Sequence, residues 1–138
     1  DYFVKKWENK ISEFTFFGMD RNHNVVEHSI QNSKRAGIDD ISNFKAQSIE
    51  KLSRPNGPEG LVIVNPPYGS RIGKKKDLFS LYRTFGEKMK NEFSGWRVGM
   101  ITSDNALAQS TKLPLISSEL AISNGGLKIH LYRTETLA

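Results

Sequence analysis

Apolar and polar positions in the first part of this chain predict a strand followed by a helix. The apolar run Phe14–Met19 ends at Asp20, a pattern typical of a buried strand in a parallel sheet. Asn24 and Glu27 then have the spacing of a helix capping box, and Gly37 is a typical residue to end a helix. We therefore expect a helix that starts near Asn24 and stops at Gly37.

The same alternation of elements continues through the middle of the chain. Short strands are predicted over Asn43–Ala46 and Leu61–Val64, and the two prolines that follow end the second strand because proline cannot donate to a ladder. Large apolar residues recur every three or four positions over Asp77–Phe93, which predicts an amphipathic helix. A further strand is expected over Trp96–Thr102.

The last part of the chain predicts a hairpin. A short helix is expected near Asn105–Gln109, and the pattern over Leu113–Ile122 is ambiguous. Asn124-Gly125-Gly126 is a strong turn signal, and Leu127–Arg133 alternates as a half-exposed strand does. We therefore expect the sheet to close with an antiparallel hairpin.

Strands and helices in this order predict an α/β fold with a doubly wound, mostly parallel sheet. The 138 residues leave room for about one domain, so a single domain is expected over residues 1–138. Ligands of such sheets bind beyond the carboxyl ends of the strands. Chemistry is therefore expected among the residues that follow the predicted strands: Asp20, Gln47, Ser48, Asn65 to Tyr68, Ser103 and Asp104.

Composition excludes several kinds of site. The chain has no cysteine, which rules out disulfides, thiolate metal sites and cysteine nucleophiles. His23, His28 and His130 show no metal-ligand spacing, so no metal is expected. No apolar run is long enough to span a membrane and the N-terminal residues are charged, so we expect a cytoplasmic protein. The net charge of +5 suits a polyanionic partner, and it is also common in proteins that bind none.

Asn65 to Tyr68, Asn-Pro-Pro-Tyr, is the most informative stretch chemically. Each proline keeps the residue before it out of the helical region, so the backbone direction is fixed. The Asn65 amide oxygen and the Pro66 carbonyl oxygen then form two rigid acceptors, which can hold a planar exocyclic amine while its nitrogen attacks an electrophilic carbon. Tyr68 offers a face on which a flat base can stack. In the structural alternative, the prolines only end the strand and Tyr68 covers the core.

Two further groups have both a binding and a structural interpretation. Asp20 fits the acidic residue that accepts hydrogen bonds from a ribose in nucleotide-binding α/β folds, and it equally fits an acid or cap at the start of a helix. Arg71, Lys74, Lys75 and Lys76 follow the motif on an expected loop. They could contact RNA phosphates, although a solvated basic loop is the more common case.

Three segments together resemble a known family: Phe17 to Arg21, Asn65 to Gly73, and Met89 to Trp96. They are similar to the class I S-adenosylmethionine-dependent methyltransferases that modify guanine N2 in large-subunit ribosomal RNA, a family often joined to an RNA-binding THUMP domain. Asn-Pro-Pro-Tyr alone is shared with methyltransferases of adenine N6, cytosine N4 and protein glutamine. Two further segments distinguish the guanine-N2 family from these other methyltransferases. They are the Gly-x-Arg-Ile-Gly extension of the motif and the segment Lys-Asn-x-Phe-x-Gly-Trp. The resemblance covers about residues 14–133 and implies a Rossmann-like methyltransferase sheet.

The resemblance implies S-adenosylmethionine as cofactor, ribosomal RNA as partner, and methyl transfer to an exocyclic amine of a base. It assigns amine binding and base stacking to Asn65, Pro66, Pro67 and Tyr68, and cofactor binding to Asp20, Gln47, Ser48 and Asn65. Relatives place an acidic residue near the adenine at about Gln47 and Ser48, and neither is acidic here. A DNA adenine-N6 methyltransferase and a non-catalytic RNA-binding module that has lost the cofactor loop are the alternatives.

A second departure from the family concerns its first strand. That strand and its Gly-rich loop, which cradle the methionine part of the cofactor in relatives, have no counterpart in Asp1–Glu13, so we expect upstream residues of a longer enzyme to complete the site. Without this first strand, the strands at Phe14–Met19 and Leu61–Val64 lack a shared neighbour. Their facing edges would then hold unpaired backbone groups, and each such group costs about 1–3 kcal/mol when it is buried. Three arrangements are open: the two strands pair directly, Tyr2–Trp7 substitutes, or upstream residues supply the strand, which is the arrangement we expect.

Overall fold

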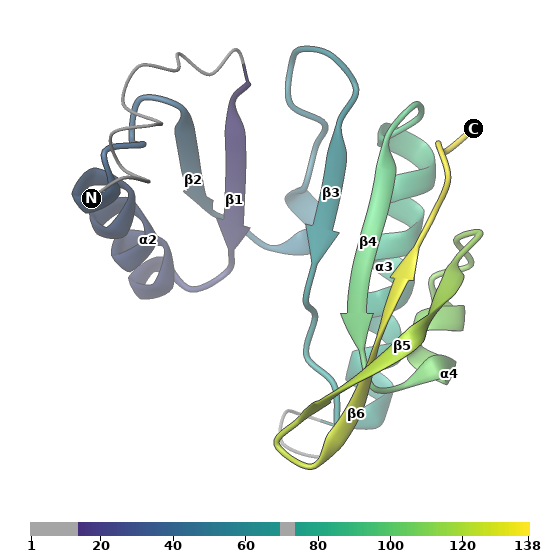
Figure 1. Cartoon of the computed structure of the whole chain (residues 1–138). Coiled ribbons are helices and arrows are strands. Elements are labelled where there is room, and N and C mark those ends of the chain that lie inside the picture. Colours follow the sequence, from purple (N-terminus) through teal and green to yellow (C-terminus); the bar gives the residue numbers. More distant parts are fainter. Residues whose placement is uncertain (1–13, 70–73) are drawn as a thin grey trace. The chain divides into compact units, whose positions relative to one another are not determined.

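The computed structural model describes residues 14–69 and 74–138, which form two compact units (Figure 1). Unit 1 ends at Ser48, and unit 2 runs from Ile49 to Ala138. Strands and helices alternate, with parallel strand pairs followed by a C-terminal antiparallel hairpin, so the predicted α/β class is confirmed. The single domain over residues 1–138 stays a prediction. Among the described helices, none combines the length and the hydropathy of a membrane span.

Unit 1 contains a two-stranded parallel sheet, built from β1 (Phe16–Asp20) and β2 (Ser42–Ala46). The predicted parallel strand is therefore confirmed, but its predicted burial is wrong, since Phe16 is 58% exposed and Met19 is 39% exposed. Within unit 1, β1 contacts β2 and the helix α2 (His23–Ala36). One neighbouring strand and one helix cannot cover both faces and both edges of a strand, so its apolar side chains remain accessible.

The N-terminal cap of α2 lies two residues earlier than predicted. The cap is Asn22 instead of Asn24, and its side-chain oxygen accepts from the Asn24 backbone N–H at 2.9 Å. The turn into the helix is held by Asp20, whose carboxylate accepts from the Asn22 backbone N–H at 2.8 Å, and this contact places Asn22 at the cap. The predicted end is confirmed, because Gly37 has a φ of +68°, which glycine adopts readily.

Unit 2 contains a four-stranded sheet with the order β3-β4-β6-β5. Strands β3 and β4 are parallel, whereas β6 is antiparallel to both β4 and β5, which confirms the predicted hairpin. The segment with an ambiguous sequence pattern contributes to β5. The strands are β3 (Leu61–Val64), β4 (Arg97–Thr102), β5 (Ile116–Asn124) and β6 (Leu127–Arg133), and the helices are η1 (Ile49–Lys51), α3 (Lys75–Glu92) and α4 (Asn105–Ser110).

Helix α3 includes part of the predicted basic loop. It begins at Lys75, so Lys75 and Lys76 lie in its first turn and their expected loop conformation is wrong. The backbone N–H of Asp77 donates to the Lys74 carbonyl oxygen at 2.9 Å, which extends the helical turn ahead of Asp77. The negative charge of Asp77 favours this end of the helix. Arg71 lies outside the described residues.

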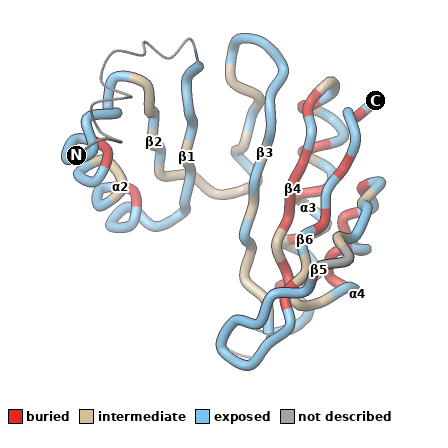
Figure 2. The backbone as a smooth tube through the Cα atoms, in the orientation of Figure 1, coloured by how far each residue is buried: buried red, intermediate tan, exposed pale blue. Residues whose placement is uncertain are grey.

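The core of unit 2 lies on one face of its sheet, between the sheet and α3 (Figures 1 and 2). Alternate residues of β4 point into this core, so Val98, Met100 and Thr102 are buried. On β3 the alternate residues Leu61 and Ile63 point to the opposite face and are 56% and 70% exposed. The described residues of unit 2 therefore cover one face of the sheet far better than the other.

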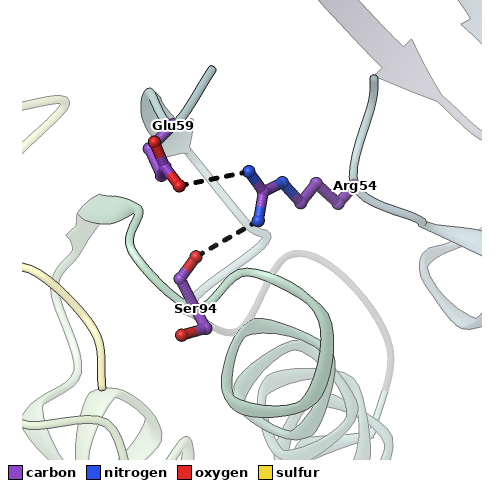
Figure 3. A network of polar contacts seen from close by, with 3 residues as sticks. All are labelled: Arg54, Glu59 and Ser94. Carbon is purple, nitrogen blue, oxygen red and sulfur yellow. Dashed lines mark hydrogen bonds and ion pairs between the residues drawn. The ribbon is translucent and has the colours of Figure 1, made fainter. Parts of the chain in front are cut away.

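Arg54 connects the loop before β3 with the turn before β4 (Figure 3). Its guanidinium donates to the Glu59 carboxylate at 3.5 Å and to the Ser94 carbonyl oxygen at 3.4 Å. The same group lies 5.9 Å from the centre of the Trp96 ring. Exposed ion pairs of this length contribute little to stability, so the stacking on Trp96 is the more important contact.

Strands β1 and β3 belong to different sheets, one in each unit. The first of the three predicted arrangements, in which the two strands pair directly, stays a prediction. The second arrangement involves Tyr2–Trp7, which lies outside the described residues. The third, a strand supplied by upstream residues, stays a prediction.

Candidate active site

The carboxyl ends of β3 and β4 lie side by side in unit 2. In their parallel ladder Val64 is opposite Met100, so the chain leaves both strands at the same edge of the sheet. Asn65 to Tyr68 follow β3, and Ser103 and Asp104 follow β4. The structure therefore brings together the two groups in unit 2 that the sequence places at strand ends, where α/β folds bind ligands.

Asn65 and Pro66 present acceptors that no other described residue uses. Asn65 is exposed, and no described donor bonds to its amide oxygen or to the Pro66 carbonyl oxygen. The Pro67 carbonyl differs, because it accepts a hydrogen bond from the Tyr82 hydroxyl at 3.2 Å. The turn thus anchors one carbonyl internally and leaves two acceptors for a ligand. An amine with two N–H donors requires two such acceptors.

Tyr68 is half-buried, and its side chain packs against the core of unit 2. The structural role considered for this residue, covering the core, is therefore present. A half-buried aromatic ring still exposes part of its surface, on which a base can stack. The two roles are compatible, and the stacking role stays a prediction.

Tyr82 and Thr102 form a buried polar contact behind the motif. Their hydroxyl oxygens lie 3.0 Å apart, with Tyr82 1% exposed and Thr102 fully buried. Desolvation by burial raises the pKa of Tyr82 to about 12, so its hydroxyl keeps its proton at neutral pH. In the sequence, Tyr82 belongs only to the apolar stripe of a helix. No sequence signal separates it from a core residue, because its contact with Pro67 depends on how α3 packs.

Asp104 has a structural task at the end of β4. Its carboxylate accepts from the Leu107 backbone N–H at 3.0 Å and caps α4. Its own backbone N–H donates to the Thr102 hydroxyl oxygen at 3.3 Å. The carboxylate therefore stabilises the helix start, and the backbone joins the buried contact of Thr102.

In unit 1, Asp20 and Gln47 lie together at the ends of β1 and β2. Asp20 is opposite Ala46 in the ladder, and its carbonyl oxygen accepts from the Gln47 backbone N–H at 2.9 Å. One carboxylate oxygen of Asp20 accepts from the Asn22 N–H, which leaves the other oxygen available to a ligand. Asp20 is not the helix cap, since Asn22 fills that position.

The residues in unit 1 fit a nucleoside ligand in their chemistry. The exposed Asp20 carboxylate can accept from ribose hydroxyls. Gln47 is half-buried, and its side-chain amide nitrogen contacts the Met19 sulfur at 2.9 Å, which leaves its amide oxygen as an acceptor for a base amine. Ser48 is also half-buried and adds a hydroxyl. A neutral amide can thus replace the acidic residue that relatives are expected to place there.

The predicted site residues are divided between the two units. Asp20, Gln47 and Ser48 belong to unit 1, whereas Asn65, Pro66, Pro67 and Tyr68 belong to unit 2. Histidine, aspartate and glutamate side chains in the described ranges form no cluster of three or more that could hold a metal ion.

Sequence comparison relates this chain to ribosomal RNA methyltransferases. A family profile described as "RMKL-like, methyltransferase domain" matches residues 3–132. Ribosomal RNA large subunit methyltransferase K/L of Vibrio cholerae is 34% identical over 119 residues, and the protein of that name from Shewanella sp. (strain W3-18-1) is 36% identical over 119 residues. Each alignment covers 86% of this chain but only 17% and 16% of the relative, so the chain spans about one sixth of the length of these relatives.

Solved structures confirm the Rossmann-like methyltransferase fold. The structure of SMU.472 complexed with SAH superposes with a TM-score of 0.76 at 26% identity, covering 89% of this chain and 32% of SMU.472. TrmN from Thermus thermophilus superposes with a TM-score of 0.74 at 20% identity, covering 97% of this chain and 40% of TrmN. The second likeness, at this identity, concerns the fold alone.

Proposed function

This chain belongs to the RMKL-like methyltransferase domain family, and on that premise we propose that it is part of an S-adenosylmethionine-dependent N-methyltransferase. The proposed acceptor is an exocyclic amine of a nucleic-acid base, namely guanine N2 of large-subunit ribosomal RNA. The names of the relatives, ribosomal RNA large subunit methyltransferase K/L, support RNA as the substrate class. A ribosomal RNA substrate would make the cytoplasm the site of action.

The observation that carries this proposal is the pair of unused acceptors at the carboxyl end of β3. The Asn65 amide oxygen and the Pro66 carbonyl oxygen have no described donor, and two consecutive prolines hold the backbone between them. An exocyclic amine carries two N–H donors, so the two oxygens can hold it in one orientation.

The chain's own residues then account for the chemistry by positioning. Bound S-adenosylmethionine would supply an electrophilic methyl group. Asn65 and Pro66 accept from the amine, which directs its nitrogen lone pair along one line, and Tyr68 holds the plane of the base. No strong base is needed among these residues, because the nitrogen becomes cationic and can then release its proton to solvent. Alignment of this kind is worth several kcal/mol of a reaction barrier.

Cofactor binding is proposed for the group in unit 1. The Asp20 carboxylate would accept from the ribose hydroxyls, and Gln47 and Ser48 would contact the adenine edge. The hydrogen bond between the Asp20 carbonyl and the Gln47 N–H keeps these residues adjacent and supports a shared ligand. Asn65 is proposed to hold the substrate amine first of all, and its contact with the cofactor is proposed to add little to cofactor affinity.

We also propose that upstream residues of the same protein supply a further strand. Within its own unit each of these strands has one described partner: β1 pairs with β2, and β3 pairs with β4. Both strands carry strongly exposed apolar side chains, with Phe16 58% and Ile63 70% exposed. An open strand edge with apolar faces favours pairing with another strand. Such a strand would pair with the backbone N–H and C=O groups at the open edge.

The direct test is methyl transfer by the full-length protein. Purified protein is incubated with radiolabelled S-adenosylmethionine and either unmodified large-subunit ribosomal RNA or double-stranded DNA. We expect label in guanine N2 of the RNA from the wild type and none from Asn65→Ala. Label in adenine N6 of the DNA alone would replace the proposed substrate by the DNA alternative. Cofactor-independent RNA binding without any label in either substrate would overturn the catalytic proposal in favour of a binding module.

A further inference from the structure

A chain of hydrogen bonds connects the end of β4 with the motif that follows β3. The Asp104 backbone N–H donates to the Thr102 hydroxyl oxygen at 3.3 Å, the Thr102 and Tyr82 hydroxyl oxygens lie 3.0 Å apart, and the Tyr82 hydroxyl bonds to the Pro67 carbonyl oxygen at 3.2 Å. All four residues belong to unit 2. Three elements that are distant in sequence thus meet through two hydroxyl groups.

The direction of each donor follows from the chemistry of its partner. The Pro67 carbonyl oxygen can only accept, so the Tyr82 hydroxyl donates its single proton to it. The Thr102 oxygen already accepts from the Asp104 N–H, and its own proton is then available to the Tyr82 oxygen. Each proton donated along this series of hydrogen bonds has one acceptor, and the last acceptor, the Pro67 carbonyl oxygen, belongs to the motif.

From this arrangement we infer that Tyr82 is a positioning residue, which fixes the Pro67 carbonyl and thereby orients the Asn65 and Pro66 acceptors toward the substrate amine. This inference rests on the proposed function of the motif. Pro66 and Pro67 lack backbone N–H groups, so two of the four residues of the motif have no backbone donor with which to fix the turn. The described residues anchor its backbone from outside through Tyr82, which is 1% exposed and rigidly packed in the core.

Tyr132 provides a matched control for a tyrosine that is only structural. It is also buried, at 3% exposed, and its hydroxyl donates to the Asn105 side-chain oxygen at 3.3 Å, in α4. Substituting either tyrosine with phenylalanine leaves the ring packing in place and removes one hydroxyl. Tyr82→Phe loses two hydrogen bonds, to Pro67 and Thr102, and Tyr132→Phe loses one, to Asn105. Only the Tyr82 variant loses a hydrogen bond that reaches the motif.

The test combines a structural and a kinetic measurement on the full-length protein. Amide hydrogen exchange is followed in peptides that contain Tyr68 and Gly69, for wild type, Tyr82→Phe, Thr102→Val, Thr102→Ser and Tyr132→Phe. We expect faster exchange in Tyr82→Phe and a smaller acceleration in Thr102→Val, while Thr102→Ser, which keeps the hydroxyl, and Tyr132→Phe match the wild type. For methyl transfer we expect kcat to fall on the order of 10-fold to 100-fold in Tyr82→Phe with an unchanged KM for S-adenosylmethionine.

The outcomes separate the inference from the proposed function. The positioning role of Tyr82 would be overturned, whatever the activity, if Tyr82→Phe and Tyr132→Phe showed equally fast exchange at Tyr68 and Gly69. Normal kcat in Tyr82→Phe would overturn its importance for the reaction. Accelerated exchange in Tyr82→Phe, with no methyl transfer even by the wild type, would support the anchoring contact and overturn the proposed function.

Discussion

Gly86 in α3 lies directly against the backbone of Thr111, which follows α4. A Cβ atom added to Gly86 would lie 1.9 Å from the Thr111 carbonyl oxygen, far inside van der Waals contact. Glycine at this position therefore permits the close approach of the two helices. Neither helix could keep its place with any other residue at position 86.

We expect Gly86→Ala to destabilise the protein. Alanine favours a helix over glycine by about 1 kcal/mol, but the clash with a buried backbone oxygen forces the helices apart, and overpacking costs about 1–3 kcal/mol or more. The measured free energy of unfolding in denaturant should therefore fall despite the better helix propensity. Gly99→Ala is the control, since its Cβ would lie 4.0 Å from the Ile63 side chain and needs no rearrangement. Equal stability of the two variants would contradict a packing role for Gly86.

Asn65→Ala should abolish methyl transfer and leave cofactor affinity nearly unchanged, because the Asn65 amide oxygen is proposed to hold the substrate amine. Asn65→Asp keeps an acceptor oxygen and should retain part of the activity. Initial rates and calorimetric titration with S-adenosylmethionine measure the two effects separately. Turnover close to wild type in Asn65→Ala would show that the amine is held elsewhere.

Asp20→Ala should weaken cofactor binding by about 1–3 kcal/mol, the usual loss for a charged acceptor. The variant also removes the hydrogen bond to the Asn22 N–H, so Asn22→Ala serves as a control for helix capping. Removal of the Asn22 cap should cost about 1 kcal/mol of stability without a comparable loss of cofactor affinity. If the dissociation constant is unchanged in Asp20→Ala, this carboxylate does not bind the cofactor and only accepts the local hydrogen bond of the turn.

Reversing Lys74, Lys75 and Lys76 to glutamate should leave the salt dependence of RNA binding unchanged. All three are exposed, and Lys75 and Lys76 lie in the first turn of α3, where negative charge is favoured over positive charge by about 0.3–1 kcal/mol per residue. The variant should therefore be at least as stable as the wild type. RNA affinity is measured at several salt concentrations, and log affinity is plotted against log salt. If these lysines bind RNA, the slope flattens by about 0.7 for each phosphate that is no longer neutralised.

Arg54→Ala should lower the free energy of unfolding by about 1 kcal/mol, whereas Glu59→Ala should have almost no effect. The guanidinium stacks on Trp96 and bonds to the Ser94 carbonyl, while Glu59 offers it one long contact at 3.5 Å. Denaturant unfolding of both variants provides the comparison. Equal decreases in the two would mean that the ion pair, and not the ring, holds Arg54.

Local chemistry explains why several elements could be predicted with accurate bounds. Leu61–Val64 is a continuous aliphatic run that two prolines end, and the strand has these bounds. Gly37 ends α2 because a left-handed residue closes the helix, and Gly125 and Gly126, with φ of +58° and +81°, form the hairpin turn before β6. In each case the deciding interaction lies within a few residues, so the sequence carries it.

The motif itself was also evident from the sequence, because the restraint that prolines impose on Asn65 and Pro66 is covalent and local. The sequence by itself thus determined which residues form a rigid turn and which strand precedes it. It determined the family as well, through the resemblance of segments on both sides of the motif.

Only the tertiary structure decided which polar groups remain available and which are anchored. The Pro67 carbonyl is occupied by Tyr82, 15 residues further along the chain, while the Pro66 carbonyl has no described donor. The exposure of Phe16 likewise contradicts the burial that its apolar sequence run suggests. The physical reason is the same in both cases: burial and hydrogen bonding depend on which distant elements pack against a residue, and a local pattern of apolar and polar positions does not contain that information.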